Sequence, residues 1–260
     1  MRLLAIETTG AKASVALIDE MGNVTVQGSD ETMNHLQHLI PMIQQLLIKC
    51  ELTINDVTGI LVSEGPGSFT GIRIGMATAK GLAQALNVPI VGVPTLRSFT
   101  YHEQKKEVIV CPVFDARREQ VYSGAYLWNG EDAVQLVEDG AYDLKEHLAH
   151  LEAAIAGAAG SRAAEVEGVS EVPAKVLFFG DGLDRYQNTI EVWAETVMNS
   201  GIEVEFASPE RRYQEAVSVA KLGKKMFLEG KQKQFGEMEP VYLRQAEAQR
   251  KLEERMAQMR

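Results

Sequence analysis

Short runs of hydrophobic residues, separated by turn-forming residues, open the chain and predict three strands. Two later segments instead carry hydrophobic residues at intervals of three and four, the period of an amphipathic helix. The expected elements of this unit are the strands 2–7, 13–19 and 23–29, the helix 36–47, the strand 59–63, the helix 72–86 and the strand 88–93. We expect Pro41 to bend the first helix and Asn87 to end the second.

The same order of elements begins again in the second half of the chain. The expected strands there are 107–115, 120–128, 133–138, 174–180 and 203–207, with one helix over 143–156 and another after the GDG motif at 180–182. A repeat of about a hundred residues predicts a duplicated domain rather than a solenoid. Two stacked copies leave a cleft between them.

These patterns divide the chain into four segments. They are an N-terminal half over 1–104, a C-terminal half over 105–207, a helix and anchor over 208–244 that pack on the body, and a polar tail over 245–260. The second half contains an insertion rich in alanine and glycine at about 152–174, to which we assign no role. Ser208 and Pro209 are suited to a helix cap and first turn, so we expect the last helix to begin there.

Composition narrows the class of protein. The 260 residues are 45% hydrophobic, enough for one large core or two smaller ones. With 26 basic and 36 acidic residues the net charge is −10, the wrong sign for binding nucleic acid alone. Cys50 and Cys111 stand far apart, which disfavours a disulfide framework or a cysteine zinc site. No segment approaches the roughly 18 apolar residues of a membrane span, so we expect a cytoplasmic protein without membrane contact.

Aligning the two halves by their first hairpins places Glu7 and Asp115 at equivalent positions, each at the end of a first strand. Carboxylates at such positions can face a cleft and handle a metal–phosphate or another polar ligand. Acidic residues also cap turns on protein surfaces without any further role. Both interpretations remain open, and the matched pair favours the cleft.

The segment SEGPGSFTGIRIG, residues 63–75, passes from a strand to a helix through a glycine-rich loop. Its glycines permit positive φ, and the amides near Gly67 and Ser68 could bind an anion. It is not a Walker A motif, because Ile72 and Arg73 follow its last loop glycine where a lysine and a hydroxyl are required.

The helix that follows this loop carries a strip almost without side chains, formed by Gly71, Gly75 and Ala79. Another helix can lie unusually close to such a strip. The neighbour is either an element of the same domain or a helix of a second protein. The sequence leaves both alternatives open.

Five motifs in order resemble the TsaB family, also called YeaZ: HLQHLIPMIQQLL, SEGPGSFTGIRIGMATAKGLA, VGVPTLRSF, CPVFDARREQVY and EPVYLR. The resemblance covers nearly the whole chain. It implies an α/β fold of two ribonuclease-H-like halves, of the actin, sugar-kinase and heat-shock ATPase type. It further implies a subunit that supports TsaD, with the ATPase TsaE, in transferring a threonylcarbamoyl group to N6 of adenosine 37 in tRNAs that read ANN codons. TsaB itself is not catalytic in the family.

The resemblance also implies where partners bind. The two N-terminal helices form the joint with TsaD, or with a second copy of the chain when it is alone. The implied interface residues are Leu36, Leu39, Ile40, Ile43, Leu47, Gly71, Ile72, Gly75, Met76 and Ala79. The candidates for a nucleotide or cleft site are Glu7, Gly67, Ser68, Arg73 and Asp115. We expect no cofactor on this chain alone, ATP or ADP only at the complex interface, and tRNA only through the complex.

Catalytic residues are not evident in the sequence. A TsaD-like metal site needs two histidines four residues apart, whereas VPTLRSFTYH contains only His102. We therefore expect no catalytic residue and no metal site. The alternative is an independent small-molecule kinase or ATPase that uses the cleft, but such an enzyme needs more carboxylates than Glu7, Asp115 and the GDG motif supply.

Overall fold

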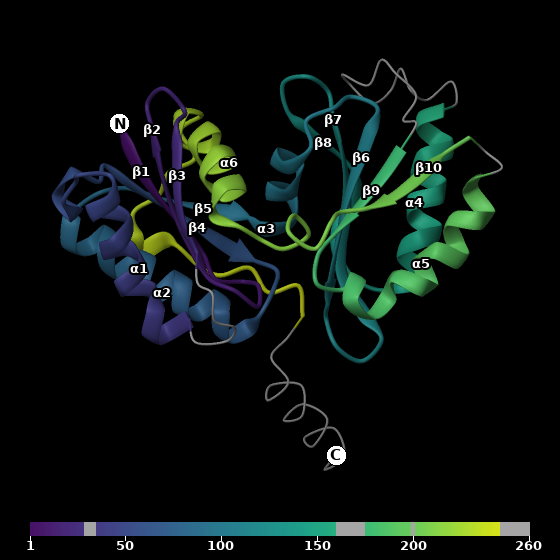
Figure 1. Cartoon of the computed structure of the whole chain (residues 1–260), viewed down its shortest axis with the longest axis horizontal. Helices are drawn as coiled ribbons and strands as arrows, with labels where there is room; N and C mark the ends of the chain where they lie inside the picture. The colour runs from purple at the N-terminus through teal and green to yellow at the C-terminus, as the bar shows by residue number, and fades with distance from the viewer. Residues whose placement is uncertain (29–34, 160–174, 199–200, 245–260) are drawn as a thin grey trace, which may run out of the picture.

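The computed structural model describes residues 1–28, 35–159, 175–198 and 201–244. The predicted polar tail and most of the predicted insertion lie outside these residues. Two lobes lie side by side, each built on a five-stranded mixed sheet (Figure 1). No helix among the described residues has both the length and the apolar character needed to cross a membrane.

The first lobe follows the predicted order. Its elements are β1 (Arg2–Glu7), β2 (Ser14–Asp19), β3 (Val24–Gly28), α1 (His35–Lys49), η1 (Ile54–Asp56), β4 (Gly59–Gly65), α2 (Phe69–Leu86) and β5 (Ile90–Pro94). The sheet order is β3-β2-β1-β4-β5, with β1 antiparallel to β2 and parallel to β4. The apolar stripes of α1 and α2 pack on one face of this sheet, as their periodicity predicts.

The second lobe repeats this topology. Its elements are β6 (Val108–Asp115), β7 (Gln120–Trp128), β8 (Ala133–Asp143), α4 (Leu144–Ala159), β9 (Lys175–Phe179), α5 (Leu183–Met198) and β10 (Glu203–Phe206). The order β8-β7-β6-β9-β10 matches the first sheet position by position, and α4 and α5 cover its outer face. The predicted fold class, a duplicated two-lobed α/β structure, is confirmed.

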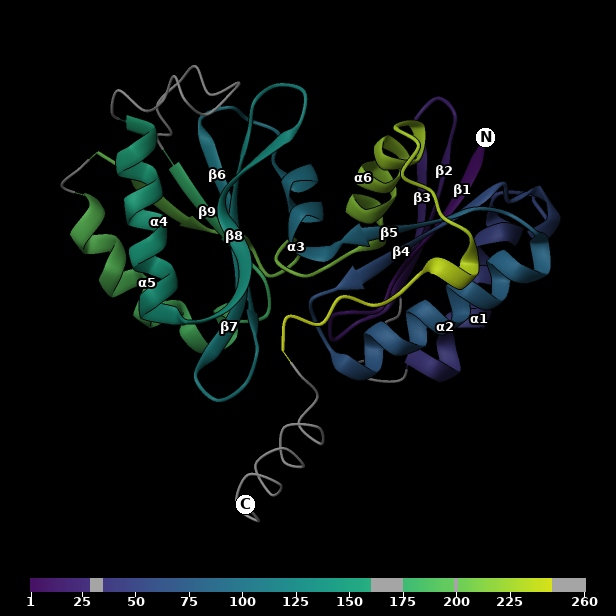
Figure 2. The ribbon, with the colours of Figure 1, turned by 180° about the vertical axis from the view of Figure 1, so that it is seen from behind.

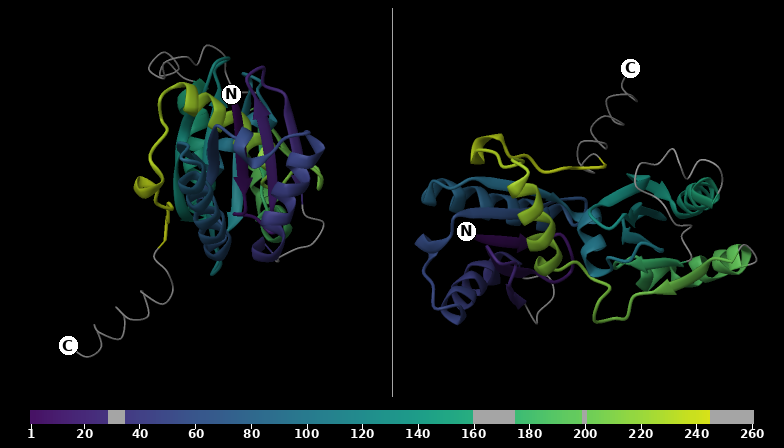
Figure 3. Two further views of the ribbon diagram at one scale, coloured as in Figure 1. Left: turned by 90° about the vertical axis from the view of Figure 1, so that its left-hand side faces the viewer. Right: turned by 90° about the horizontal axis from the view of Figure 1, so that it is seen from above.

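A layer of helices lies between the two sheets and packs on their inner faces. It contains α3 (Thr95–Ser98), η2 (Phe99–His102) and α6 (Ala216–Leu228). Residues of α6 pack on the first sheet, opposite α1 and α2, and the residues of α3 and η2 pack on the second (Figures 1 and 3). After α6 the chain passes through η4 (Phe235–Glu237) and returns along the first lobe.

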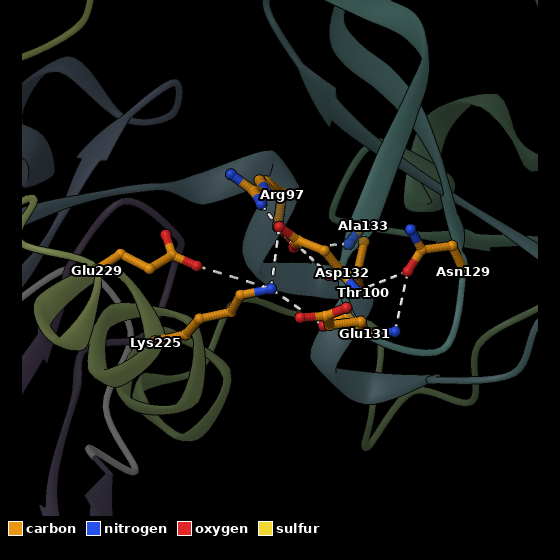
Figure 4. A network of polar contacts seen from close by, with 8 residues as sticks. All are labelled: Arg97, Thr100, Asn129, Glu131, Asp132, Ala133, Lys225 and Glu229. Atoms are coloured by element: carbon orange, nitrogen blue, oxygen red, sulfur yellow. Dashed lines mark hydrogen bonds and ion pairs between the residues drawn. The ribbon is translucent and has the colours of Figure 1, made fainter. Parts of the chain in front are cut away.

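A polar network joins the lobes at this layer (Figure 4). Asp132, in the β7–β8 turn, accepts a hydrogen bond from Arg97 of α3 at 2.6 Å and pairs with Lys225 of α6 at 3.0 Å. Lys225 also donates to the carbonyl oxygen of Glu131 at 3.0 Å. Burial opposes ionisation of Asp132, but the bonds from Arg97 and Lys225 outweigh it and lower the pKa of this carboxyl.

Two local predictions have different outcomes. Asn87 ends α2 in the left-handed conformation, with φ of 53°, as predicted. The last helix does not begin at Ser208, because residues 208–215 form the irregular link from the second lobe back to the first. Helix α6 begins at Ala216, whose amide donates to Ser14 Oγ at 2.9 Å. The side chain near this N-terminus therefore comes from β2, which no local pattern could reveal.

Candidate functional site

Glu7 does not reach the cleft. It is the last residue of β1, is fully buried, and accepts hydrogen bonds from the amide of Thr9 at 2.5 Å, from Thr9 Oγ1 at 2.6 Å and from Ser63 Oγ. Burial raises the pKa of this carboxyl, although the bonds from Ser63 and Thr9 act in the opposite direction. Glu7 therefore stabilises the turn after β1 from inside the lobe. The prediction that it faces the cleft is wrong, because its side chain is buried and does not line the cleft.

A cleft of about 720 Å³ lies where the two lobes face each other. It is lined by residues 9–11 after β1, 66–72 before and within α2, 114–118 at and after the end of β6, and 241–244 near the end of the described chain, together with Ile74, Tyr122, Asp181 and Gln214. Gly67, Ser68 and Asp115 thus lie where a cleft ligand could contact them, whereas Arg73 is not part of the lining.

Asp115 shares the cleft with a second carboxylate that the sequence only suggested. Asp181, from the GDG motif, accepts a hydrogen bond from the amide of Asp115 at 3.2 Å. Burial, and then the charge of Asp115, raise the pKa of Asp181 to about 6. Asp115 is bonded in turn to the amide of Arg117 at 2.8 Å.

Gln214 was missed because it lies in the irregular link before α6. Its side chain is 6% exposed, and its Oε1 has no hydrogen-bond partner within the described residues. The cleft thus offers polar groups and two carboxylates. No cluster of three metal-ligating side chains occurs in the part of the chain that the structure describes.

The glycine strip of α2 packs within its own lobe. A Cβ on Gly71 would overlap the carbonyl oxygen of Thr8, and one on Gly75 would overlap Thr8 Oγ1. Thr8 Oγ1 also donates to the carbonyl oxygen of Gly71 at 2.7 Å. The five predicted interface residues of α2 are buried in the first lobe of the single chain: Gly71, Ile72, Gly75, Met76 and Ala79.

On α1 the prediction divides in the same way. Leu39, Ile43 and Leu47 are buried in the core of the first lobe, so in the single chain their side chains are not exposed to a partner. Ile40 is 46% exposed, and the side chain of Leu36 lies outside the described positions. Ile48, which is not among the predicted interface residues, is 75% exposed.

Helices α1 and α2 lie side by side on the first lobe (Figure 2), and each carries exposed residues. We call these residues the α1–α2 face, and they are Ile40, Gln44, Ile48, Thr70, Arg73, Ala77 and Gly81. Their spacing of three and four residues places them opposite the buried stripes. The exposure of these residues could have been predicted from the sequence, by assigning the longest run of regularly spaced apolar residues in each helix to the core.

A histidine, a cysteine and a serine meet inside the second lobe. His147 Nε2 lies 2.9 Å from Ser123 Oγ and 3.3 Å from Cys111 Sγ, and all three residues are buried. Burial raises the pKa of the Cys111 thiol to about 12 and lowers that of His147 to about 4. A protonated thiol without access to solvent is not a nucleophile.

The fold and these sites define a two-lobed, duplicated α/β protein with an interlobe cleft and an exposed helix pair. The family model "TsaD: tRNA N6-adenosine threonylcarbamoyltransferase" matches residues 29–252. The tRNA threonylcarbamoyladenosine biosynthesis protein TsaB of Escherichia coli strain K12 is 28% identical, covering 97% of this chain and 98% of that protein. TsaB of Bacillus subtilis strain 168 is 35% identical over 139 residues, 54% of this chain and 61% of that protein.

A solved structure, YeaZ from Pseudomonas aeruginosa, has the same fold with a TM-score of 0.69 and 24% identity, covering 93% of this chain and 99% of that one. The chain belongs to the TsaD family and, within it, to the TsaB (YeaZ) proteins. The family resemblance predicted from the five motifs is confirmed.

Proposed function

We propose that this chain is a non-catalytic subunit in the biosynthesis of threonylcarbamoyladenosine in tRNA. It pairs with a TsaD homologue through the α1–α2 face and supports transfer of the threonylcarbamoyl group to N6 of adenosine 37. The observation that carries this proposal is the exposure of Ile48 and Ile40, at 75% and 46%, on a helix whose other side is packed in the core. An apolar helix face of this kind is suited to a protein partner.

A supporting rather than catalytic role fits the chemistry of the chain. Cys111 and His147 are buried, and Glu7 is bound inside the first lobe. The fifth strand is followed by a stretch that contains a single histidine, His102, where TsaD-like metal binding needs a pair. The carbamoyl-transfer chemistry therefore belongs to the partner.

The remaining parts of the proposal concern the larger assembly. TsaE is a further subunit, the chain forms a homodimer in the absence of TsaD, and tRNA is contacted through the complex. ATP or ADP binds at the complex interface and not to this chain alone. The net charge of −10 supports the indirect contact with tRNA, since phosphate binding needs a basic surface.

Mixing the purified chain with the TsaD homologue of the same organism tests this function. Light scattering after gel filtration should give the mass of a heterodimer, and threonylcarbamoyl transfer to tRNA should need both proteins. Transfer by this chain alone would contradict the non-catalytic role. Separate elution of the two proteins would contradict the pairing.

One observation favours a second candidate, an independent small-molecule kinase or ATPase. The cleft of about 720 Å³ contains Asp115 and Asp181, two carboxylates of the kind that position magnesium and phosphate. This function predicts ATP turnover by the chain alone that is abolished by Asp115→Asn. The proposed TsaB function predicts no ATP turnover by the wild-type chain alone or by Asp115→Asn.

A further inference from the structure

The chain segment after η4 is built into both lobes. We call residues 238–244 the C-terminal strap; Figure 2 shows it, in yellow, running along the first lobe toward the second. Lys80 Nζ donates to the carbonyl oxygen of Met238 at 2.9 Å, and the amide of Val241 donates to the carbonyl oxygen of Glu64 at 2.7 Å. Arg244 Nη1 donates to the carbonyl oxygen of Ala116, in the second lobe, at 2.7 Å.

Gly65 shows how closely the strap is seated. Its φ is +114°, a region that disfavours side chains, and a Cβ at this position would overlap the carbonyl oxygen of Val241. The glycine-rich loop, whose sequence is compatible with a phosphate cradle, therefore accommodates the chain's own strap. A seat with this shape and these bonds fixes the position of the residues that follow Val241.

The next strap residue, Tyr242, holds an arginine of the α1–α2 face. Arg73 Nε donates to Tyr242 Oη at 3.1 Å, and the guanidinium carbon lies 3.8 Å from the centroid of the Phe69 ring. The rings of Phe69 and Tyr242 are themselves 5.0 Å apart. Three side chains from α2 and the strap thus form one cluster.

The guanidinium of Arg73 is fixed in position but uses only part of its hydrogen-bonding capacity. Its Nε is bonded to Tyr242, while its two terminal nitrogens have no hydrogen-bond or ion-pair partner among the described residues. Two parallel N–H donors are the geometry that binds a carboxylate with both its oxygens. Fixing the side chain in advance lowers the conformational entropy that binding would otherwise cost.

We propose that the C-terminal strap is a positioning element, in which Tyr242 holds Arg73 as a preformed receptor for one carboxylate of the TsaD-type partner. This inference rests on the proposed function and adds one specific contact to it. A single guanidinium beside two rings matches one carboxylate, whereas a nucleotide triphosphate needs several cations. Arg73, Phe69 and Tyr242 are all exposed in the single chain, so the ion pair gains strength only when the partner covers this cluster and excludes water from it.

A double-mutant cycle on the full-length chain tests the coupling between the two residues. The readout is the calorimetric Kd for the purified TsaD homologue. Arg73→Ala should weaken binding about 10- to 100-fold, the effect of losing hydrogen bonds to a charged group. Tyr242→Phe removes only the hydroxyl and should weaken binding about 3- to 10-fold. The double variant should bind no more weakly than Arg73→Ala, because Tyr242 acts through Arg73.

Additive effects in the cycle would overturn the positioning role of Tyr242. Binding to TsaD that is unchanged by Arg73→Ala, with loss of ATP or ADP from the complex instead, would overturn the carboxylate assignment. The affinity of the wild type should also fall with salt more steeply than that of Arg73→Ala, since an ion pair is screened. Equal salt dependence would contradict an ionic contact.

Two further variants separate this inference from the proposed function. Arg185, which lies 5.1 Å above the Tyr186 ring in the second lobe, is a matched arginine away from the α1–α2 face, and Arg185→Ala should leave the Kd unchanged. Ile48→Asp should abolish pairing whether or not the strap has a role. If Ile48→Asp abolishes pairing and the Arg73 and Tyr242 variants do not weaken it, only the strap inference fails. If Ile48→Asp also binds normally, the proposed function fails.

Discussion

At the scale of single residues, the one hydroxyl proton of Ser123 determines the protonation of His147. Ser123 Oγ donates this proton to the carbonyl oxygen of Pro112 at 2.6 Å. It must then accept from His147 Nε2, so the imidazole carries its proton on Nε2. His147 Nδ1 has no hydrogen-bond partner within the described residues. If Nδ1 were protonated as well, its N–H would be buried without an acceptor.

This arrangement predicts a pH dependence of stability. The pKa of His147 is about 4 in the folded chain and 6.5 in its unperturbed state, so the unfolded chain binds the proton first as the pH falls. Between pH 7 and 5 this group should remove about 2 kcal/mol of unfolding free energy. His147→Leu should show a smaller loss over that interval in urea titrations. His150→Leu, at an exposed histidine on the same helix, should change the profile only slightly, because burial and not the charge of His150 is the larger cause of the lowered His147 pKa.

The candidate site shows the limit of sequence at this scale. Glu7 and Asp115 occupy matching ends of β1 and β6, as alignment of the halves predicts. Their environments differ because Thr9 and Ser63 enclose Glu7, and Ser63 comes from another strand. Gln214 gave no local signal at all, since its burial depends on how the link between lobes crosses the cleft.

At the scale of elements, α2 shows what periodicity predicts and what it leaves out. The apolar spacing and Asn87 define the helix and its end from local residues. The neighbour of its glycine strip is Thr8, more than sixty positions earlier in the chain, and no local pattern specifies that contact. Small residues indicate close approach, but they do not indicate whether the approaching group belongs to the same molecule.

Two glycines of α2 provide a matched test of this packing. Gly71→Ala should lower the free energy of unfolding by several kcal/mol, because its Cβ would overlap the carbonyl oxygen of Thr8. Gly81→Ala adds a Cβ that meets nothing within 4 Å and should stabilise the helix by about 0.5–1 kcal/mol. Chemical denaturation measures both values. Equal stability of the two variants would contradict packing of the strip in the lobe core.

At the scale of the whole molecule, the duplication was readable because each half repeats the same order of strands and helices. The contacts that hold the two halves together could not be predicted from the sequence. Arg97, Asp132 and Lys225 come from three different segments and meet between the lobes. The C-terminal strap also connects the two lobes, through the hydrogen bond from Arg244 to Ala116. Such contacts depend on the assembled fold and leave no spacing in the sequence.

The Asp132 network is predicted to hold the two lobes at a fixed angle. Asp132→Ala removes the shared partner of Arg97 and Lys225 and should lower the unfolding free energy by about 1–2 kcal/mol. Electron-resonance distances between spin labels, one in each lobe, should broaden. Glu203→Ala breaks an exposed pair with Lys175 and should change neither property. An unchanged distance distribution for Asp132→Ala would show that the strap and the packing suffice to fix the angle.

The central claim is that the exposed side of α1 and α2 binds a TsaD-type partner. Its most direct test is the affinity of the full-length Ile48→Asp variant for the TsaD homologue, with Val192→Asp as control. Val192 is 66% exposed on α5 of the other lobe, so both variants place a charge at an exposed apolar position. We predict that Ile48→Asp weakens binding about 100-fold or more and that Val192→Asp has no effect. Wild-type affinity for Ile48→Asp, or equal loss in both variants, would contradict the claim.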